Sequence, residues 1–262
     1  VVNGELREAT PADVCIEYIG DSITSGAGLC EAGSSWEATK AYSYISAQIL
    51  GADHIVTSRG GMGIAYGNNK NGGLDNAVNT MYPLANYARS DTDKYVPTRT
   101  PNLIVINLCT NDDGYWPSDM VNNGVADYTY YDAEFAELID YITELYGTKD
   151  IPILFVMGCM RDIDASISYA EKRIPQLIES DEYKEYDMRT VVLTKNNNGA
   201  SSHPDAAGAQ LQGEELAAFI QEEYPELFTT VGLDVLLADE DVGFDLTVGE
   251  DKEINPWSLA MQ

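Results

Sequence analysis

The chain has 262 residues, of which 44% are hydrophobic and 22% are charged, a composition typical of a folded globular protein and not of a disordered one. Its 15 Lys and Arg face 43 Asp and Glu, and the formal net charge of −28 excludes nucleic acid and anionic membrane surfaces as partners held by charge. Because the sequence has neither a membrane-spanning apolar stretch nor a signal-peptide pattern at its start, we expect a soluble protein.

Five short apolar runs rich in Val and Ile predict strands of a parallel sheet covered on both faces. They span residues 14–19, 54–58, 103–108, 151–157 and 190–193. Helical patterns separate them at residues 38–50, 132–146, 165–180 and 206–223, and Gly147 supplies a stop for the clearest one. Strands alternating with helices predict an α/β protein, a three-layer α/β/α sandwich around a parallel sheet of about five strands.

Two segments differ from this pattern. Residues 68–100 are rich in Asn, Gly, Asp and Tyr, and predict an excursion over one sheet edge with a short helix around 77–89. Residues 229–262 alternate apolar runs with acidic turns, typical of a β-hairpin appendage or an inter-domain linker. We therefore divide the chain into a lead (1–13), a main domain (14–228) and an acidic appendage (229–262).

Four of the predicted strands are followed by residues that suit acyl transfer. These are "GDS" (20–22), "RGGMG" (59–63), "TND" (110–112) and "SSHPD" (201–205). Ligands of parallel sheets bind outside the carboxyl ends of the strands, so these residues are expected at one rim. Together they supply a hydroxyl nucleophile, a glycine N–H for an oxyanion, a side-chain amide donor and an imidazole base.

Each of these residues also has a simpler interpretation when taken alone. Ser22 is a good cap for a following helix, and Asn111 is a good turn former. Their joint occurrence with His203 favours the catalytic interpretation. The other histidine, His54, opens a predicted strand far from any carboxyl end, so a structural role is expected.

The four blocks, in this order across residues 14–225, resemble the SGNH (GDSL-like) hydrolase superfamily. They are "GDSIT", "SRGGMG", "CTND" and "SSHPDAAG". Within the superfamily the chain is most similar to the carbohydrate esterase family 2 deacetylases. The resemblance implies a flavodoxin-like fold and a serine esterase. Since that family usually carries a β-sandwich domain ahead of the catalytic one, the termini are the expected places for an additional domain or scaffold.

The resemblance also implies individual roles. Ser22 is the expected nucleophile and His203 the expected base. The Ser22 N–H, the Gly63 N–H and the Asn111 amide are the expected oxyanion donors, with Gly60 and Gly61 as alternatives to Gly63.

The two motif aspartates, Asp21 and Asp112, are interpreted as turn-forming carboxylates that hold the loops. Tyr115 and Trp116 follow shortly after the third block. An aromatic side chain there either stacks on a sugar or acyl group of a substrate or packs within the protein.

Two positions depart from the superfamily pattern. Cys109 replaces the glycine that normally opens the third block, and Ala200 stands where an aspartate often precedes the histidine by three residues. A backbone carbonyl, a hydroxyl or a remote acid must then orient His203. We therefore predict a Ser22–His203 dyad without an essential carboxylate.

Three functions remain in contention. The first is a secreted serine esterase that removes acetyl or other small acyl groups from a carbohydrate such as acetylated xylan or glucomannan, without a metal or organic cofactor. The second is a lipid or thioester acyl hydrolase of the same fold. The third is a non-catalytic carbohydrate-binding module. Four scattered cysteines and two histidines give no recognisable metal site.

Overall fold

A computed structural model describes residues 10–30, 36–65, 77–84, 93–114, 121–122, 125–160 and 168–228. The 229–262 appendage, most of the predicted lead and much of the predicted excursion lie outside the described residues.

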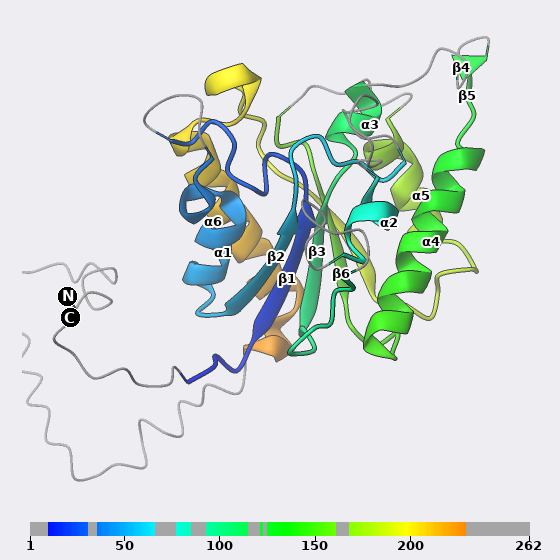
Figure 1. Ribbon diagram of the computed structural model, residues 1–262, viewed down its shortest axis with the longest axis horizontal. Helices are drawn as coiled ribbons and strands as arrows, with labels where there is room; N and C mark the ends of the chain where they lie inside the picture. Colours follow the sequence, from blue (N-terminus) through cyan, green and yellow to red (C-terminus); the bar gives the residue numbers. More distant parts are fainter. Residues whose placement is uncertain are drawn as a thin grey trace, which may run out of the picture.

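Five parallel strands form the central sheet in the order β2-β1-β3-β6-β7 (Figure 1). They are β1 (Cys15–Gly20), β2 (Asp53–Ser58), β3 (Leu103–Asn107), β6 (Ile153–Met157) and β7 (Met188–Val192). Each begins and ends within two residues of a predicted apolar run, so the predicted parallel sheet is confirmed. A separate antiparallel pair consists of β4 (Val121–Asn122) and β5 (Val125–Ala126).

Helices cover both faces of the sheet and make the predicted three-layer sandwich (Figure 1). One side carries α1 (Tyr42–Ile49) and α6 (Ala206–Glu223); the other carries α2 (Val78–Met81), α4 (Thr129–Tyr146) and α5 (Ile174–Ile178). The 3-10 turns are η1 (Ala38–Lys40), η4 (Ala200–Ser202) and η5 (Pro225–Leu227), and α3 (Thr110–Gly114) follows β3. Helix α4 ends as predicted, because Gly147 has φ 69° and its N–H caps the carbonyl of Thr143.

Alternate residues of each central strand enter different cores. On β3, Ile104 and Ile106 belong to the core under α4, whereas Leu103 and Val105 belong to the core under α1 and α6. The strands β1, β3 and β6 are buried along their whole length. The prediction that every strand is covered on both faces is wrong for β2 and β7, which are half exposed because they form the sheet edges.

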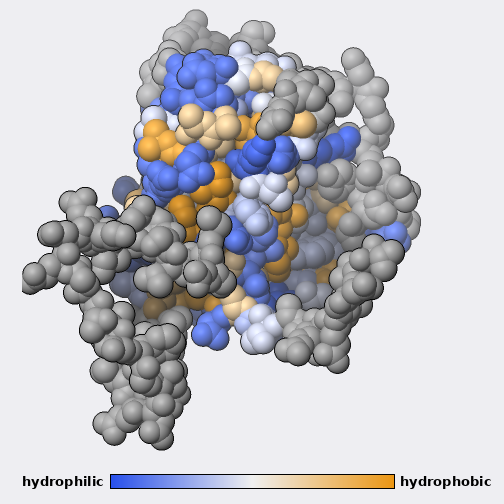
Figure 2. Space-filling view, turned by 90° about the vertical axis from the view of Figure 1, so that its left-hand side faces the viewer, coloured by the Kyte–Doolittle hydropathy of each residue, from blue (hydrophilic) through white to orange (hydrophobic). Residues whose placement is uncertain are grey.

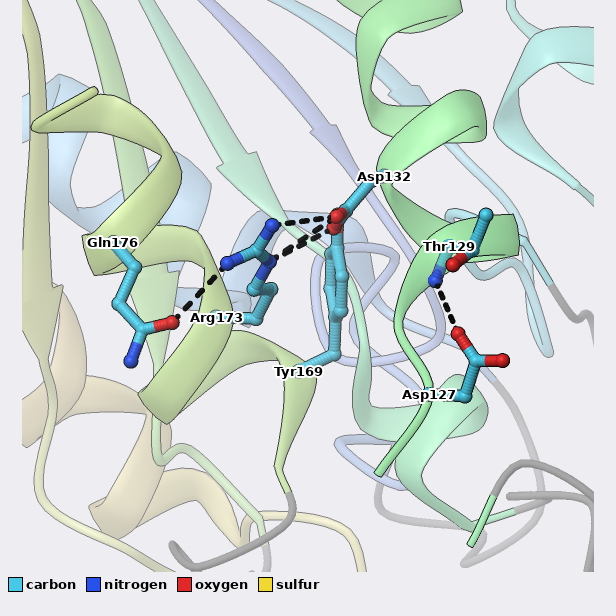
Figure 3. A network of polar contacts seen from close by, with 6 residues as sticks. All are labelled: Asp127, Thr129, Asp132, Tyr169, Arg173 and Gln176. Atoms are coloured by element: carbon cyan, nitrogen blue, oxygen red, sulfur yellow. Dashed lines mark hydrogen bonds and ion pairs between the residues drawn. The ribbon is translucent and has the colours of Figure 1, made fainter. Parts of the chain in front are cut away.

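The predicted helix at 165–180 is divided in the structure. A π-helical turn, η3 (Tyr169–Arg173), precedes α5, and residues 161–167 lie outside the described part. Arg173 binds Asp132 on α4 through two nitrogens, with Nη2 2.7 Å from Oδ2, and the Tyr169 hydroxyl donates to Oδ1 at 3.2 Å (Figure 3). This network joins the start of α4 to the 168–178 segment.

The side of the molecule that carries α1 and α6 has a mixed surface, on which hydrophilic residues alternate with smaller apolar patches (Figure 2). No helix in the described ranges is long and apolar enough to cross a membrane. All four cysteines are free; Cys15, Cys109 and Cys159 are buried, as their apolar surroundings in the sequence predict.

Candidate active site

Ser22 lies two residues beyond the end of β1, in a turn that its neighbours define. Gly20 ends the strand at a position where a Cβ would lie 2.0 Å from Oγ1 of Thr24, so only glycine fits. The buried Asp21 then accepts the N–H of Ile23 at 2.9 Å through Oδ1. The carbonyl of Ser22 accepts the N–H of Ala27 at 2.9 Å. The turn therefore holds Ser22 at the carboxyl edge of the sheet.

His203 comes to Ser22 from the other end of the sequence. It directly follows η4 in the loop after β7, and its Nε2 lies 2.7 Å from Oγ of Ser22, a residue 181 positions earlier. The two half-buried side chains thus form a hydrogen bond of ordinary length.

The other ring nitrogen of His203 shows which tautomer this contact requires. Nδ1 lies 3.2 Å from the carbonyl oxygen of Ala200. Since a carbonyl only accepts, Nδ1 carries the proton and Nε2 offers its lone pair to the Ser22 hydroxyl. Within the described ranges, no carboxylate makes a hydrogen bond or ion pair with His203.

The loop that carries His203 has an unusual backbone. Ser201 and Ser202 have φ values of 54° and 59°, in the left-handed region that few non-glycine residues adopt. This double bend turns the Ala200 carbonyl back toward the imidazole. Gly28, itself at φ 80°, packs against the same carbonyl, and a Cβ on it would lie 3.1 Å from the Ala200 oxygen.

Asp205, the carboxylate nearest to His203 in the sequence, has another task. Its Oδ1 accepts the N–H of Gly208 at 2.8 Å and so caps the N-terminus of α6. The same oxygen accepts a second hydrogen bond, from Nδ2 of Asn196, at 3.1 Å. Asp205 therefore fixes where the His203 loop enters α6.

Asn111 and Asp112, on α3, connect three of the predicted blocks. Nδ2 of Asn111 donates to Oδ2 of Asp21 at 3.1 Å and to the carbonyl of Met62 at 2.9 Å. The buried Asp112 accepts the N–H groups of Ile64 at 2.9 Å and Ala65 at 2.8 Å. Asp21 and Asp112 hold loops as the sequence predicts. The Asn111 amide is directed at two protein acceptors, so its role toward an oxyanion stays a prediction.

The glycine block follows β2 in a tight turn. The N–H of Met62 donates to the carbonyl of Arg59, and Gly61 within this turn has φ 82°. Gly63 lies further on, in an isolated parallel bridge with Ala77. The sequence predicts that the Gly63 N–H, and not that of Gly60 or Gly61, faces an oxyanion. This assignment stays a prediction.

Cys109 stands where the superfamily usually has a glycine, and its backbone has a conformation that favours glycine. It has φ 79°, and its side chain is buried. Burial raises the pKa of its thiol well above the ordinary value, which makes it a packing side chain and not a nucleophile. Tyr115 and Trp116 lie outside the described residues. His54, by contrast, packs edge-on against Tyr44 with ring centroids 5.3 Å apart, a structural position as predicted.

Asp113 also belongs to this region, although no sequence motif indicates it. Its carboxylate accepts hydrogen bonds from the Ser168 hydroxyl at 2.9 Å and from the N–H of Tyr169 at 3.1 Å, and so connects α3 to η3. Burial raises its pKa from 3.8 to about 7. Nothing in the motif distinguishes it from Asp112, because the contacts come from a segment about 55 residues later.

The topology explains why these groups meet. Strands β1 and β3 are neighbours, and the strand order runs from β1 to β2 on one side and from β3 to β6 on the other. Ligands of open α/β sheets bind at such a reversal, beyond the carboxyl ends. Ser22 follows β1 and Asn111 follows β3. The arrangement offers a hydroxyl, a lone pair positioned to take its proton, and donors nearby, which are the groups that acyl transfer requires.

Comparison with protein families gives one match, to the model of the GDSL-like lipase/acylhydrolase family, over residues 16–216. No curated protein matches the chain.

Solved structures with the same fold include a family two carbohydrate esterase from Clostridium thermocellum in complex with cellohexaose, with a TM-score of 0.68 and 22% identity, covering 84% of this chain and 67% of that one. An acetyl xylan esterase from the rumen bacterium Butyrivibrio proteoclasticus has a TM-score of 0.65 and 20% identity, covering 86% and 68%. A family two carbohydrate esterase from Cellvibrio japonicus has a TM-score of 0.65 and 18% identity, covering 83% and 63%. The chain thus spans about two thirds of the length of these proteins.

Proposed function

Because this chain belongs to the GDSL-like lipase/acylhydrolase family, we propose that it is a serine esterase that removes acetyl or other small acyl groups from a carbohydrate. The observation that carries the proposal is the 2.7 Å contact between Oγ of Ser22 and Nε2 of His203. In that contact the nucleophile already donates to its base.

The proposed reaction has two steps. Oγ of Ser22 attacks the ester carbonyl carbon while Nε2 of His203 takes the serine proton, and the imidazolium then gives that proton to the departing sugar hydroxyl. Water, deprotonated by the same nitrogen, attacks the acyl-enzyme and releases the carboxylic acid. No metal or organic cofactor takes part in these steps.

The oxyanion of each tetrahedral intermediate needs donors at the carboxyl edge. We assign them to the backbone N–H of Ser22, the N–H of Gly63 and the amide of Asn111. In the structure that amide lies 2.9 Å from the Met62 carbonyl and 3.1 Å from Asp21. A substrate oxygen therefore has to take one of these amide hydrogens from its present acceptor.

A neutral sugar ester suits the charge of the protein. A chain with a formal net charge of −28 repels anionic substrates such as phospholipid surfaces, whereas an acetylated xylan or glucomannan segment carries no charge to repel. The names of the structural neighbours, family two carbohydrate esterases and an acetyl xylan esterase, support the same substrate class. Since such polymers lie outside cells, we propose that the protein acts as a secreted enzyme.

The proposal is tested by comparing the wild type with Ser22→Ala on a chromogenic acetyl ester and on acetylated xylan and glucomannan. We expect acetate release by the wild type and a loss of nearly all of it in the variant. An octanoyl ester hydrolysed as well as the acetyl ester points instead to a lipid acyl hydrolase. Equal and negligible rates for both proteins, with polysaccharide still bound, point to a binding module.

A further inference from the structure

Trp36 is the most exposed aromatic side chain in the described part of the chain. It is 52% exposed, whereas Tyr130, the next, is 43% exposed and lies on α4, on the opposite face of the sheet from α1 and α6 (Figure 1). Burying an aromatic ring of this size is strongly favourable, so a fixed ring left half open is available to a ligand.

The backbone of Trp36 is attached to the turn that holds Ser22. Trp36 forms an antiparallel bridge with Ala27, and the next residue, Glu37, donates its N–H to the carbonyl of Gly26 at 3.0 Å. Ala27 in turn donates its N–H to the carbonyl of Ser22. One hydrogen bond and one bridge thus separate the tryptophan backbone from the nucleophile.

The indole ring of Trp36 is fixed at its other end by the glycine block. A Cβ on Gly60 would lie 2.3 Å from Cη2 and 3.0 Å from Cζ2 of Trp36. The ring therefore packs directly on the Gly60 backbone, and any larger residue at position 60 would displace it. A side chain held at both its backbone and its ring loses little conformational entropy when a ligand packs on it.

The strand register brings the glycine block, on which this ring packs, close to the turn that carries the nucleophile. Gly20 of β1 pairs with Ser58 of β2, and Ser22 and Gly60 each lie two residues further on. Neighbouring strands are about 4.8 Å apart, so the chain leaves the sheet side by side at Gly20 and Ser58, and the N–H of Arg59 donates to the carbonyl of Gly20 at 3.1 Å. Ser25, in the Ser22 turn, also donates its hydroxyl to that of Ser58 at 2.8 Å, which keeps the two exits together.

We propose that Trp36 is a platform on which a neutral sugar ring of the substrate stacks while its ester reaches Ser22. This inference rests on the proposed function. A pyranose ring presents a face of C–H groups, and an indole offers a large flat apolar surface without charge. The platform selects the carbohydrate part of the substrate, whereas Ser22 and His203 act on any small acyl ester.

The test compares two substrates in Trp36→Ala and Trp36→Phe. We expect the ratio of kcat/KM for an acetylated xylo-oligosaccharide to that for 4-nitrophenyl acetate to fall about tenfold in Trp36→Ala, mainly through KM, with a smaller fall in Trp36→Phe. Tyr130→Ala, which removes an exposed aromatic elsewhere, is the matched control and should leave the ratio unchanged. An unchanged ratio in Trp36→Ala, in a variant shown to be folded by its thermal unfolding, overturns the inference.

A binding measurement separates this inference from the proposed reaction. Xylohexaose and cellohexaose, without acetyl groups, are titrated by calorimetry into Ser22→Ala and into Ser22→Ala combined with Trp36→Ala. We expect the second protein to bind about tenfold more weakly. That result supports the platform even if the wild type releases no acetate from any sugar, in which case only the proposed reaction fails. Equal affinities in the two proteins overturn the platform whatever the hydrolysis shows.

Discussion

Nδ1 of His203 lies 3.2 Å from the carbonyl oxygen of Ala200, the residue that stands where an aspartate often precedes the histidine in this superfamily. The backbone therefore does what a third side chain does in a Ser-His-Asp triad: it fixes the tautomer and the direction of the ring. A carbonyl oxygen carries only a partial charge, so it stabilises the imidazolium less than a carboxylate does.

Removing the nucleophile, the base or both should have nearly the same effect on hydrolysis. Ser22→Ala and His203→Ala should each remove almost all activity on an acetyl ester, and the double variant should lose little more, because the two side chains act as one unit. Asp205→Asn should lose far less than the roughly 10⁴-fold that removal of a triad aspartate costs. All four variants are assayed by kcat on one substrate.

Asp205→Asn is a clean comparison because asparagine is also a good N-cap. Its side-chain oxygen can still accept the N–H of Gly208, so the loop should keep its position. If Asp205→Asn were folded and as inactive as His203→Ala, the dyad would be replaced by a rearranged triad.

Gly28 is a positioning residue for the Ala200 carbonyl. Because a Cβ at position 28 would lie 3.1 Å from that oxygen, Gly28→Ala should push it off the imidazole and lower kcat/KM about tenfold. The effect is read from kcat/KM on one acetyl ester, with thermal unfolding as the check that the variant is folded.

The control for Gly28 is Gly51→Ala. Gly51 also has a left-handed backbone, with φ 61°, but its Cβ would meet nothing within 4 Å. Gly51→Ala should therefore lose stability through backbone strain and keep its kcat/KM. An equal fall of kcat/KM in both variants would show that strain alone, and not the Ala200 contact, is responsible.

Cys109 should show an inverted order of stabilities on substitution. At φ 79° a residue with a Cβ costs roughly 1–2 kcal/mol relative to glycine. Cys109→Ala loses the buried sulfur and keeps this strain, whereas Cys109→Gly loses the sulfur and relieves it. We expect Cys109→Gly to be the more stable of the two by about 1 kcal/mol in urea unfolding. The ordinary order, with alanine more stable, would mean that the strain is not felt.

Asp113 should make the stability depend on pH near neutrality. Its pKa in the folded protein, about 7, is above the ordinary 3.8, so the folded state binds this proton more tightly than the unfolded state does. The free energy of unfolding that this proton contributes is therefore lost as pH rises from about 4 through 7. Unfolding free energy should therefore fall less steeply between pH 5 and pH 8 in Asp113→Asn than in the wild type. Asp181→Asn, at a fully exposed carboxylate, removes the same charge and should keep the wild-type slope. Equal slopes in the Asp113 variant and the wild type would contradict the shift.

The sequence predicts the strands well because their runs are short, apolar and bounded by turn residues. In β1 and β3 every position is buried, and no polar residue blurs the pattern apart from Glu17 and Asn107. The exposure of the sheet edges is only partly predictable in this way. β2 and β7 contain more polar residues than the central strands, among them His54 and Arg189, but the strand order that puts both at the edges of the sheet comes only from the structure.

For the candidate site, the sequence identifies the groups and leaves out how they are held. Ser22, Asn111 and His203 each follow an apolar run in a recognisable block. No side chain in the sequence indicates the carbonyl that orients His203, because this carbonyl belongs to Ala200. Its direction depends on the left-handed backbone of Ser201 and Ser202. The contacts of Gly28 with Ala200 and of Gly60 with Trp36 cannot be predicted from the sequence either, because they join residues far apart along the chain.

The separation of 181 positions between Ser22 and His203 has a consequence for biosynthesis. The serine emerges from the ribosome early, but the histidine follows β7, which among the described strands is the last in chain order and forms an edge of the sheet. Contacts of such long range form late in folding, because a long loop has to close before they are made. With His203 as the proposed base, nascent or truncated chains that end before residue 203 should be hydrolytically inert, and the appearance of esterase activity during refolding should report the docking of β7.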